Sequence, residues 1–302
     1  MTDIQAWPAL PYEEWRGSYE TLHMWTQIVG KIRMAKAPPV NHWWHTTLHI
    51  TPRGLATSAI PHGPRSFEIT FDFIDHALMI EVSDGNERRI PLAPRTTADF
   101  YFEVMARLDE LGIPVNIWPR PVEVETSIRF DEDRVHQSYD VAHVERFHGA
   151  LLQADRVLQR FRGQFIGKSS PVHFFWGGFD IALTRFSGRR APEHPGGAPN
   201  VGRHVMVEAY SHEVASFGWW PGSALYPEPA FYAYAYPEPA GFSQAAVRPV
   251  AARYLQALGE FVLPYEAVRL APDPDAAVLA FCSDVYQAAA DLGMWNRQAL
   301  ER

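Results

Sequence analysis

Apolar residues recur at the spacing of helices over several long stretches of the chain. Between residues 12 and 36, large side chains such as Trp15, Leu22 and Trp25 return every three or four positions, and the prolines that follow end the pattern. Along 141–165 the apolar positions advance in steps of three and four, which makes one seam of a long helix apolar. The pattern predicts helices at 12–36, 97–111, 141–165, 249–262 and 275–292.

Other stretches alternate between apolar and polar residues, as strands with one buried face do. The alternation is cleanest at 66–73, where Phe67 opens an apolar face and Glu68 a polar one. The tetrapeptide Ser83-Asp84-Gly85-Asn86 is typical of a hairpin turn. Strands are predicted at 42–51, 66–73, 77–82, 88–92, 172–186, 204–217 and 231–236.

The order of these elements predicts an α+β fold with two similar halves, each an antiparallel sheet with helices on one face. The segment 39–45 is similar to 171–176, and each follows an amphipathic helix and precedes further strands. We interpret this similarity as an internal duplication with a cleft between the halves; a chance match of a few positions is the alternative. We assign residues 1–112 to the N-terminal half, 113–139 to an irregular, proline-bearing linker, and 140–302 to the C-terminal half.

The amino-acid composition excludes several classes of protein. Of the 302 residues, 47% are apolar, which predicts a folded globular chain, and the net charge of −8 argues against a nucleic acid as the partner. The single cysteine, Cys282, excludes an internal disulfide and a zinc site built from several thiolates. The N-terminus lacks the pattern of a signal peptide, and no apolar run is long enough for a membrane span, so we expect no membrane partner and a cytoplasmic location.

The polar faces of the predicted strands are unusual in composition. Opposite their apolar positions these strands carry His, Tyr, Trp and carboxylates instead of the Lys, Glu, Thr and Arg that are typical of solvated faces. Two interpretations follow. The polar faces are solvated, or they line a pocket for a small-molecule ligand. The composition favours the pocket.

Strand parity and loop positions suggest five catalytic candidates in the C-terminal half. We expect them to converge in one cavity with Trp176 and Asp180 on its wall. Two histidines and a glutamate would serve as acid/base groups, an arginine would hold an anionic group, and a tyrosine would orient the substrate. For the arginine, a salt bridge to Asp180 or a glutamate is the alternative. The five candidates are His173, Arg185, Glu208, Tyr210 and His212.

A more specific hypothesis for this site is that it binds a divalent metal, Zn or Fe. Its ligands would be His173, His212 and Glu208, since imidazole nitrogen and carboxylate oxygen are the donors that these ions favour. The spacing gives little support, because no His-Glu-x-x-His motif occurs and thirteen histidines make some clustering expected.

Four segments of the chain resemble an uncharacterised bacterial family, known only as a domain of unknown function of about 300 residues. They are HWWHTTLHITPRGL, FEITFDFIDH, SPVHFFWGGFDIALTRFSGR and EAYSHEVASFGWWPG. The resemblance covers nearly the whole chain. It implies no activity and transfers no catalytic residue.

Three functions remain open from the sequence. The first is an enzyme that acts on a small molecule in the His/Glu/Tyr-lined cleft, with or without a metal. The second is a binding protein that uses the same pocket without catalysis. The third is an interaction module in which Trp219, Trp220 and the tyrosine-rich strand at 231–236 form a partner surface.

Overall fold

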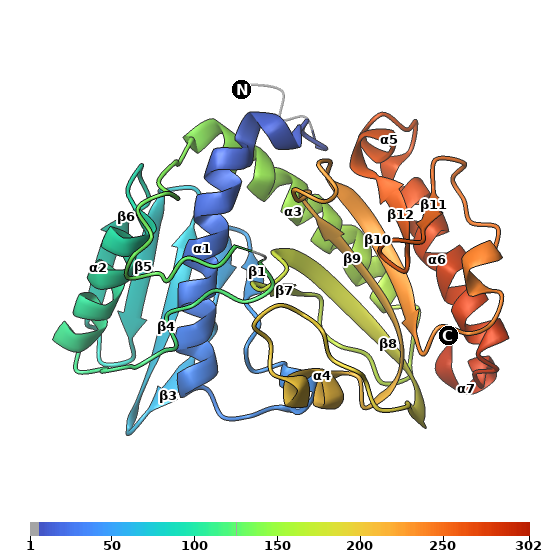
Figure 1. Cartoon of the computed structure of the whole chain (residues 1–302), viewed down its shortest axis with the longest axis horizontal. Coiled ribbons are helices and arrows are strands. Elements are labelled where there is room, and N and C mark those ends of the chain that lie inside the picture. The colour runs from blue at the N-terminus through green and yellow to red at the C-terminus, as the bar shows by residue number, and fades with distance from the viewer. Residues whose placement is uncertain (1–5, 125) are drawn as a thin grey trace.

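The structure, a computed structural model, describes residues 6–124 and 126–302 and contains two six-stranded antiparallel sheets flanked by helices (Figure 1). The predicted α+β class is therefore confirmed. The elements of the N-terminal half are α1 (Tyr12–Lys36), η1 (Asn41–Trp43), β1 (His49–Thr51), β2 (Gly54–Ala56), β3 (Ile60–His62), β4 (Arg65–Asp72), β5 (Ala77–Val82), β6 (Glu87–Pro91) and α2 (Thr97–Glu110). Those of the C-terminal half are α3 (Val141–Arg162), β7 (His173–Phe175), β8 (Asp180–Arg190), α4 (Arg203–Ala209), β9 (His212–Trp220), β10 (Ala230–Tyr236), η2 (Phe242–Gln244), β11 (Arg253–Leu255), β12 (Glu260–Pro264), α5 (Tyr265–Arg269), α6 (Pro274–Leu292) and α7 (Arg297–Leu300).

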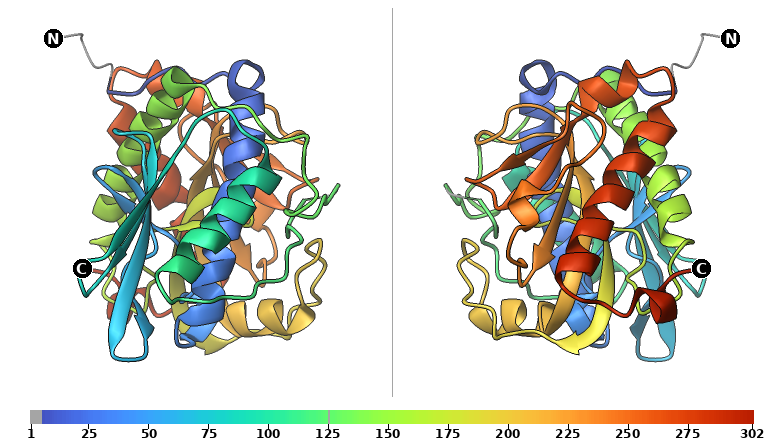
Figure 2. Two further views of the ribbon diagram at one scale, coloured as in Figure 1. Left: turned by 90° about the vertical axis from the view of Figure 1, so that its left-hand side faces the viewer. Right: turned by 90° about the vertical axis from the view of Figure 1, so that its right-hand side faces the viewer.

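The N-terminal sheet has the strand order β1-β2-β4-β5-β6, with β3 paired to β4. Helices α1 and α2 cover one of its faces, as Figure 2 shows from the side. The apolar positions of β4 pack against them: the ring of Phe100 on α2 stacks on Trp25 of α1 at 4.4 Å and on Phe71 of β4 at 6.4 Å. These large rings supply much of the burial that holds the half together.

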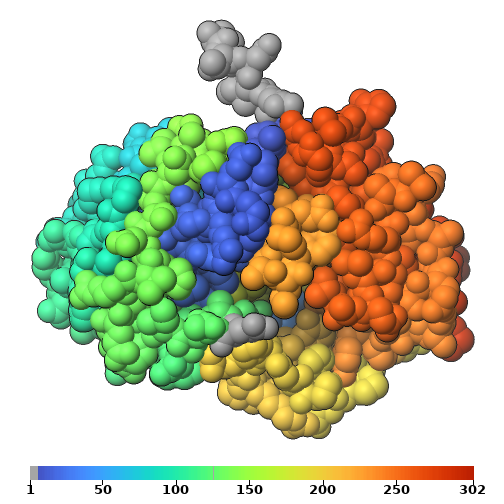
Figure 3. All heavy atoms as spheres, turned by 45° about the horizontal axis from the view of Figure 1, so that its top comes forward, coloured from blue at the N-terminus to red at the C-terminus, as the bar shows by residue number. Residues whose placement is uncertain are grey.

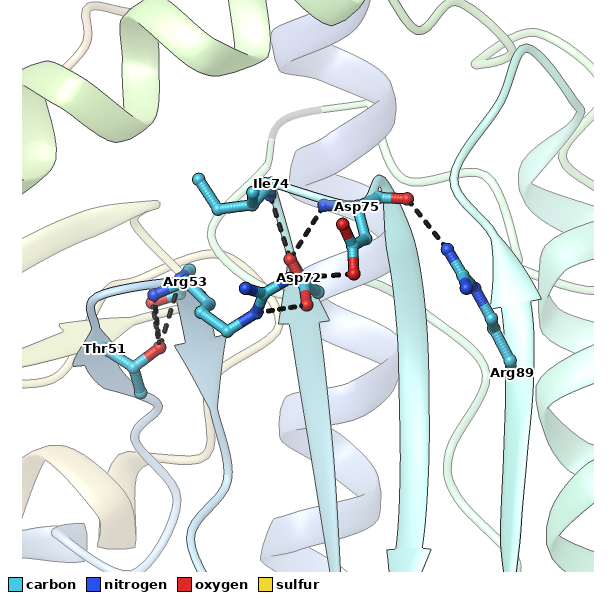
Figure 4. Close-up of polar contacts among 7 residues, drawn as sticks. Thr51, Arg53, Asp72, Ile74, Asp75 and Arg89 are labelled. Carbon is cyan, nitrogen blue, oxygen red and sulfur yellow. Dashed lines mark hydrogen bonds and ion pairs between the residues drawn. The ribbon is translucent and has the colours of Figure 1, made fainter.

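A polar turn closes the end of β4 (Figure 4). Asp72 accepts hydrogen bonds from the backbone nitrogens of Ile74 and Asp75 at 2.9 and 3.0 Å. Arg53, just before β2, pairs with the carboxylates of Asp72 at 2.6 Å and Asp75 at 2.8 Å. The turn thereby fixes the end of β4 to the start of its neighbour β2.

The C-terminal sheet has the order β11-β12-β10-β9-β8-β7. Helices α3 and α6 cover one face, and their apolar seams meet the odd-numbered positions of β9. Phe217 packs edge-on against Phe161 of α3 at 4.9 Å, and Trp219 stacks on Phe147 of α3 at 6.1 Å. The even-numbered positions of β8, β9 and β10 therefore point away from these helices.

The two sheets meet at their edges. Leu48, before β1, and Phe174 of β7 exchange two backbone hydrogen bonds of 2.9 and 2.8 Å. Helix α1 lies between the halves and touches both, as the blue surface in Figure 3 shows. From 113 to 139 the described residues form no helix or strand; the domain boundaries that we placed on either side of this segment stay predictions.

Several predicted elements are wrong. Residues 249–262 form the hairpin β11–β12 instead of a helix, because β12 pairs with β10 and buries Phe261. The predicted strand 204–217 begins as helix α4, and 172–186 is broken by a turn at 176–179. The predicted strand 42–51 starts with a helical turn in which His42 and Trp43 have positive φ.

The internal duplication is not shown. The motif that suggested it adopts a turn at 41–43 in the first half and strand β7 in the second. The strands that the match would equate also differ in place, since β1 is an edge strand and β8 lies second in its sheet.

Candidate functional site

A cavity of about 630 Å³ opens on the face of the C-terminal sheet that α3 and α6 leave free. Its other walls come from α1, from the irregular segment around residue 120, and from the loop and helix α4 between β8 and β9. In Figure 1 this loop and α4 lie in front of β8. A volume of this size matches the pockets that enclose small organic molecules.

The floor of the cavity consists of alternate side chains of three strands. Because side chains alternate across a strand, the even positions of β8, β9 and β10 all face the same way. Trp176, Asp180 and Thr184 all line the cavity. The strand side chains of the floor are Asp180, Ala182, Thr184, Phe186, Val214, Ser216, Tyr232 and Tyr234.

Asp180 is held by a tyrosine that crosses the sheet. The hydroxyl of Tyr232 donates a hydrogen bond to the Asp180 carboxylate. The ring can lie flat because its partner on β9 is Gly218. A Cβ at that position would come within 2.3 Å of Tyr232 Cζ and 2.2 Å of the Ile181 carbonyl oxygen, so only glycine fits. The sheet is thus locally built around the Asp180–Tyr232 pair.

Beside this pair, two further tyrosines meet through their hydroxyl groups. Tyr210, which follows α4, and Tyr234 of β10 are hydrogen-bonded at 2.7 Å. Tyr232 and Tyr234 stack at 6.2 Å with nearly parallel rings. The carboxylate of Asp180 therefore lies at the edge of an aromatic surface that can contact a planar ligand.

Glu123 reaches the cavity from the irregular segment. Its carboxylate lies against Gly177 and Gly178, where a side chain would collide with it. A Cβ on Gly177 would lie 2.1 Å from Glu123 Oε1. A Cβ on Gly178 would lie 3.6 Å from Glu123 Oε2 and 2.9 Å from Asp180 Oδ1, so the two carboxylates approach the same glycine. The glycines thus let two acidic groups from different parts of the chain come together.

Gln27 of α1 fixes the segment that carries Glu123. The side-chain amide of Gln27 donates to the Val122 carbonyl and accepts from the Val122 nitrogen, each at 2.9 Å. Glu123 itself donates its backbone N–H to the carbonyl of Pro199, in the loop before α4, at 2.8 Å. The roof of the cavity is therefore tied to α1 on one side and to this loop on the other.

The surroundings favour the protonated forms of both carboxylic acids. Burial raises the pKa of Glu123 to about 7, and the neighbouring Asp180 adds to the increase. Glu123 is exposed as a residue, and its carboxylate lies close to Gly177 and Gly178. Burial also raises the pKa of Asp180 to about 6, although the hydrogen bond from Tyr232 opposes this. Near neutral pH both groups can therefore give and take protons.

At another part of the wall, His42 lines the cavity and is paired with Lys168, which lies outside the lining. His42 Nδ1 donates to the carbonyl of Ala209 at 3.0 Å, which leaves Nε2 to accept from the Lys168 ammonium at 2.9 Å. This arrangement requires a neutral imidazole. Burial lowers the pKa of His42, and Lys168 lowers it further.

The comparison with known families agrees with the similarity seen in the sequence. The model of the Family of unknown function (DUF5996) matches residues 7–302. The chain belongs to this family. No curated protein and no solved structure matches it. Within the described part of this DUF5996 protein, no helix combines the length and the apolar character needed to cross a membrane.

The five predicted site residues do not converge. Tyr210 lines the cavity, but His173 and Arg185 are buried elsewhere. His173 is within hydrogen-bond distance of the Thr47 hydroxyl at 3.1 Å, and burial lowers its pKa to about 3. On β7 it lies directly opposite Ala182 of β8, on the same face of the sheet as Asp180, but it is not among the residues that line the cavity.

Arg185 points into the core beneath α3 and α6. It shares the odd parity of the apolar residues of β8, and its guanidinium lies 3.6 Å from the centroid of the Phe161 ring and 4.5 Å from that of Tyr286. It donates to the Phe161 carbonyl, and burial lowers its pKa to about 10. Neither the anion clamp nor the alternative salt bridge that we predicted is formed among the described residues.

Glu208 and His212 lie outside the cavity lining. Glu208 is exposed on α4, because the chain is helical there and the predicted strand parity does not apply. His212 begins β9, and its ring centroid is 5.8 Å from that of His42. Among the residues that the structure describes, no three His, Cys, Asp or Glu side chains form a group able to hold a metal ion. The predicted ligand set His173, His212 and Glu208 is not assembled.

Sequence reasoning missed Glu123, Lys31 and the role of Gln27. Glu123 lies in a segment without periodicity, so no pattern gave its direction. Lys31 and Gln27 lie four residues apart on α1, which reads as a buried helix, and a polar residue on such a helix was the available signal.

Proposed function

We propose that this protein is an enzyme that binds a small organic molecule in the cavity and exchanges protons with it through Glu123 and Asp180. The observation that carries the proposal is the pair of carboxylates that share the space over Gly178 inside an aromatic-lined cavity of about 630 Å³. General acid–base catalysis requires groups that titrate near the working pH and lie within reach of the ligand.

The walls indicate the kind of ligand. Indole and phenol rings from Trp43, Trp44, Trp176, Tyr232 and Tyr234 line the space. Such rings favour a planar or apolar ligand body. The carboxylate end favours a hydrogen-bond donor such as a hydroxyl or a protonated amine, since an ionised carboxylate only accepts hydrogen bonds.

Repulsion among acidic groups strengthens this preference. Burial raises the pKa of Glu260, at the start of β12, to about 8, and the nearby Asp180 adds to the increase. The two carboxyl groups that line the cavity, with Glu260 outside its lining, would therefore interact favourably with a cationic group of the ligand.

A binding protein without catalysis is the second candidate. The aromatic walls would serve it equally well, and the raised pKa values would then reflect burial alone. The interaction module is less favoured, because Trp219 is 1% exposed and Tyr232 and Tyr234 face the cavity instead of a partner.

Calorimetry with benzylamine tests the proposal. We expect the wild-type protein to bind benzylamine and Glu123→Gln to bind it about tenfold more weakly, since a charge-assisted hydrogen bond is replaced by a neutral one. Phenylacetate, which has the same ring with a carboxylate, should bind more weakly than benzylamine. Glu208→Gln, on the exposed face of α4, is the matched control and should leave the affinity unchanged. Equal affinities for Glu123→Gln and the wild type would refute the proposal.

A pH titration separates the enzyme from the binding protein. Once a turned-over substrate is found, the rate for the enzyme should follow two ionisations near pH 6 and 7 and lose that dependence in the Asp180→Asn, Glu123→Gln double variant. A ligand that is bound but never converted would favour the second candidate.

A further inference from the structure

Helix α1 contributes two described residues to the lining of the cavity, Met34 and the charged Lys31. Lys31 follows Gln27 by one helical turn, so it lies on the same side of α1 as the residue that anchors Val122. The residue is 2% exposed, yet it belongs to the cavity wall. Its side chain is therefore almost completely enclosed by protein atoms in the wall of the cavity.

Two indole rings flank Lys31. Its Nζ lies 5.1 Å from the ring centroid of Trp118 and 5.6 Å from that of Trp176. Trp176 is itself fixed, because its indole nitrogen donates to the Thr46 carbonyl at 2.6 Å. Within the described residues, no carboxylate pairs with Lys31 and no acceptor receives a hydrogen bond from it.

The environment of Lys31 makes its ammonium form less favourable than it is in water. An ammonium that leaves water without a counter-charge is costly, and burial lowers the pKa of Lys31 to about 8. The other two lysines differ. Lys36 is hydrogen-bonded to the Pro114 carbonyl near the surface, and Lys168 is bonded to His42.

We propose that Lys31 forms an imine with small aldehydes or ketones that enter the cavity. Lys31 is a buried amine in the wall of a ligand cavity, with no carboxylate partner among the described residues, and its neutral form has the electron pair that this reaction needs. The inference rests on the proposed function, since it names carbonyl compounds with an aromatic or apolar body as the ligand class of the same cavity.

The reaction balances without an oxidant or reductant. The Nζ electron pair forms a bond to the carbonyl carbon, the C=O π electrons move to oxygen, and a proton passes from nitrogen to oxygen to give a carbinolamine. Protonation of that hydroxyl lets it leave as water, and the nitrogen electron pair completes the C=N bond. The products are a protonated imine and water, and loss of one proton gives the neutral imine.

The two flanking indoles can stabilise the protonated imine as well as the lysine ammonium. A protonated imine is a cation, and the faces of Trp118 and Trp176 stabilise a cation without neutralising it. A carboxylate at this place would instead hold the lysine as an ammonium. Glu123 and Asp180 line the same cavity and would supply the carboxylic acids for the proton transfers.

Reductive trapping tests the proposal. The folded protein is incubated at pH 8 with benzaldehyde and sodium cyanoborohydride, digested with a protease that cleaves after arginine, and analysed by mass spectrometry. Arg33 separates Lys31 from Lys36, and Lys168 falls in a third peptide, so each lysine is read separately. We expect Lys31 to gain the benzyl group about tenfold faster than Lys36, because burial lowers the pKa of Lys31 and the proposed cavity brings the aldehyde beside it.

Two further measurements distinguish imine formation at Lys31 from unspecific labelling of lysines. Lys31→Arg keeps the positive charge between the indoles but cannot form an imine, and it should remove the fast labelling while Lys36 reacts as before. Pyruvate in place of benzaldehyde should label Lys31 less well than benzaldehyde does, since it lacks the aromatic body. Labelling of Lys31 that is no faster than that of Lys36, or that appears only in urea, would overturn the imine. If benzylamine still binds in that case, the proposed function stands and only this inference fails.

Discussion

The two sheets have a free face each, and the two faces differ. On the N-terminal sheet, the side of β4, β5 and β6 away from α1 and α2 carries Glu68, Thr70, Glu81 and Arg89, which are half-buried or exposed. On the C-terminal sheet, the side away from α3 and α6 carries Asp180 and tyrosines beneath a roof of irregular chain. The alternatives that the sequence left open, a solvated polar face and a pocket, are both realised, one in each half.

The residue types at the polar positions distinguish the two sheet faces better than the pattern of apolar and polar positions does. Glu, Thr and Arg keep their polar ends in water on an open antiparallel sheet. Tyr and Trp present a large apolar body with one polar atom, and they lose contact area if left in water. A sheet whose polar positions are filled by aromatic residues therefore needs a cover, and 118–123 together with the loop before α4 supplies it here.

The largest effect should come from filling the space under Tyr232. Gly218→Ala places a methyl group within 2.2 Å of the Ile181 carbonyl and 2.3 Å of the tyrosine ring, so backbone and ring must both move. We expect a loss of about 3 kcal/mol in the free energy of unfolding, measured in urea, and weaker benzylamine binding. On the open face, Thr70→Ala should change stability by less than about 0.5 kcal/mol. Similar losses in the two variants would mean that the faces do not differ as described.

Removing the anchor of the roof should have the next largest effect. Gln27→Leu keeps the volume of a completely buried side chain but leaves both the N–H and the carbonyl of Val122 without their partner. We expect a loss of about 2 kcal/mol and faster amide hydrogen exchange around Val122. Gln159→Leu, on the outer side of α3, is the matched control. Unchanged exchange at Val122 would contradict the anchoring role.

The acidic cavity predicts an unusual pH dependence of stability. Asp180 and Glu123 have pKa values raised above those of the unfolded chain, so the unfolded state loses their protons first as the pH rises. Their contribution to stability therefore falls between about pH 4 and pH 7. Asp180→Asn should be more stable than the wild type at pH 8 in urea unfolding and no more stable at pH 4. A variant that is less stable at pH 8 would show that the ionised carboxylate is favourably paired.

The helical and apolar framework was predictable from the sequence, but the cover of the cavity was not. Helix α1 has the predicted bounds of 12–36, because its apolar spacing and its terminal prolines act locally. The orientation of Asp180 and Tyr232 followed from strand parity, which is also local. Glu123 lies beside Gly177 because hydrogen bonds from the distant Gln27 hold its segment in place. Contacts between residues so far apart in the sequence produce no periodic pattern of apolar positions. The hairpin at 253–264 resembled a helix because pairing with β10 decides its structure.

The smallest effect is expected on the open face, where two carboxylates oppose each other. Glu68 of β4 and Glu81 of β5 are direct cross-strand partners. Burial raises the pKa of Glu68, and Glu81 adds to the increase, so ionisation of Glu68 lowers stability as the pH rises above the unfolded value of Glu. Glu81→Gln should therefore stabilise the protein by a few tenths of a kcal/mol at pH 7 and by nothing at pH 3, because directly opposed like charges on an exposed sheet cost little. Urea unfolding at both pH values measures the gain, and benzylamine binding should not change, since no cavity residue is touched. A gain as large as that of Asp180→Asn would mean that the open face is as poorly hydrated as the covered one.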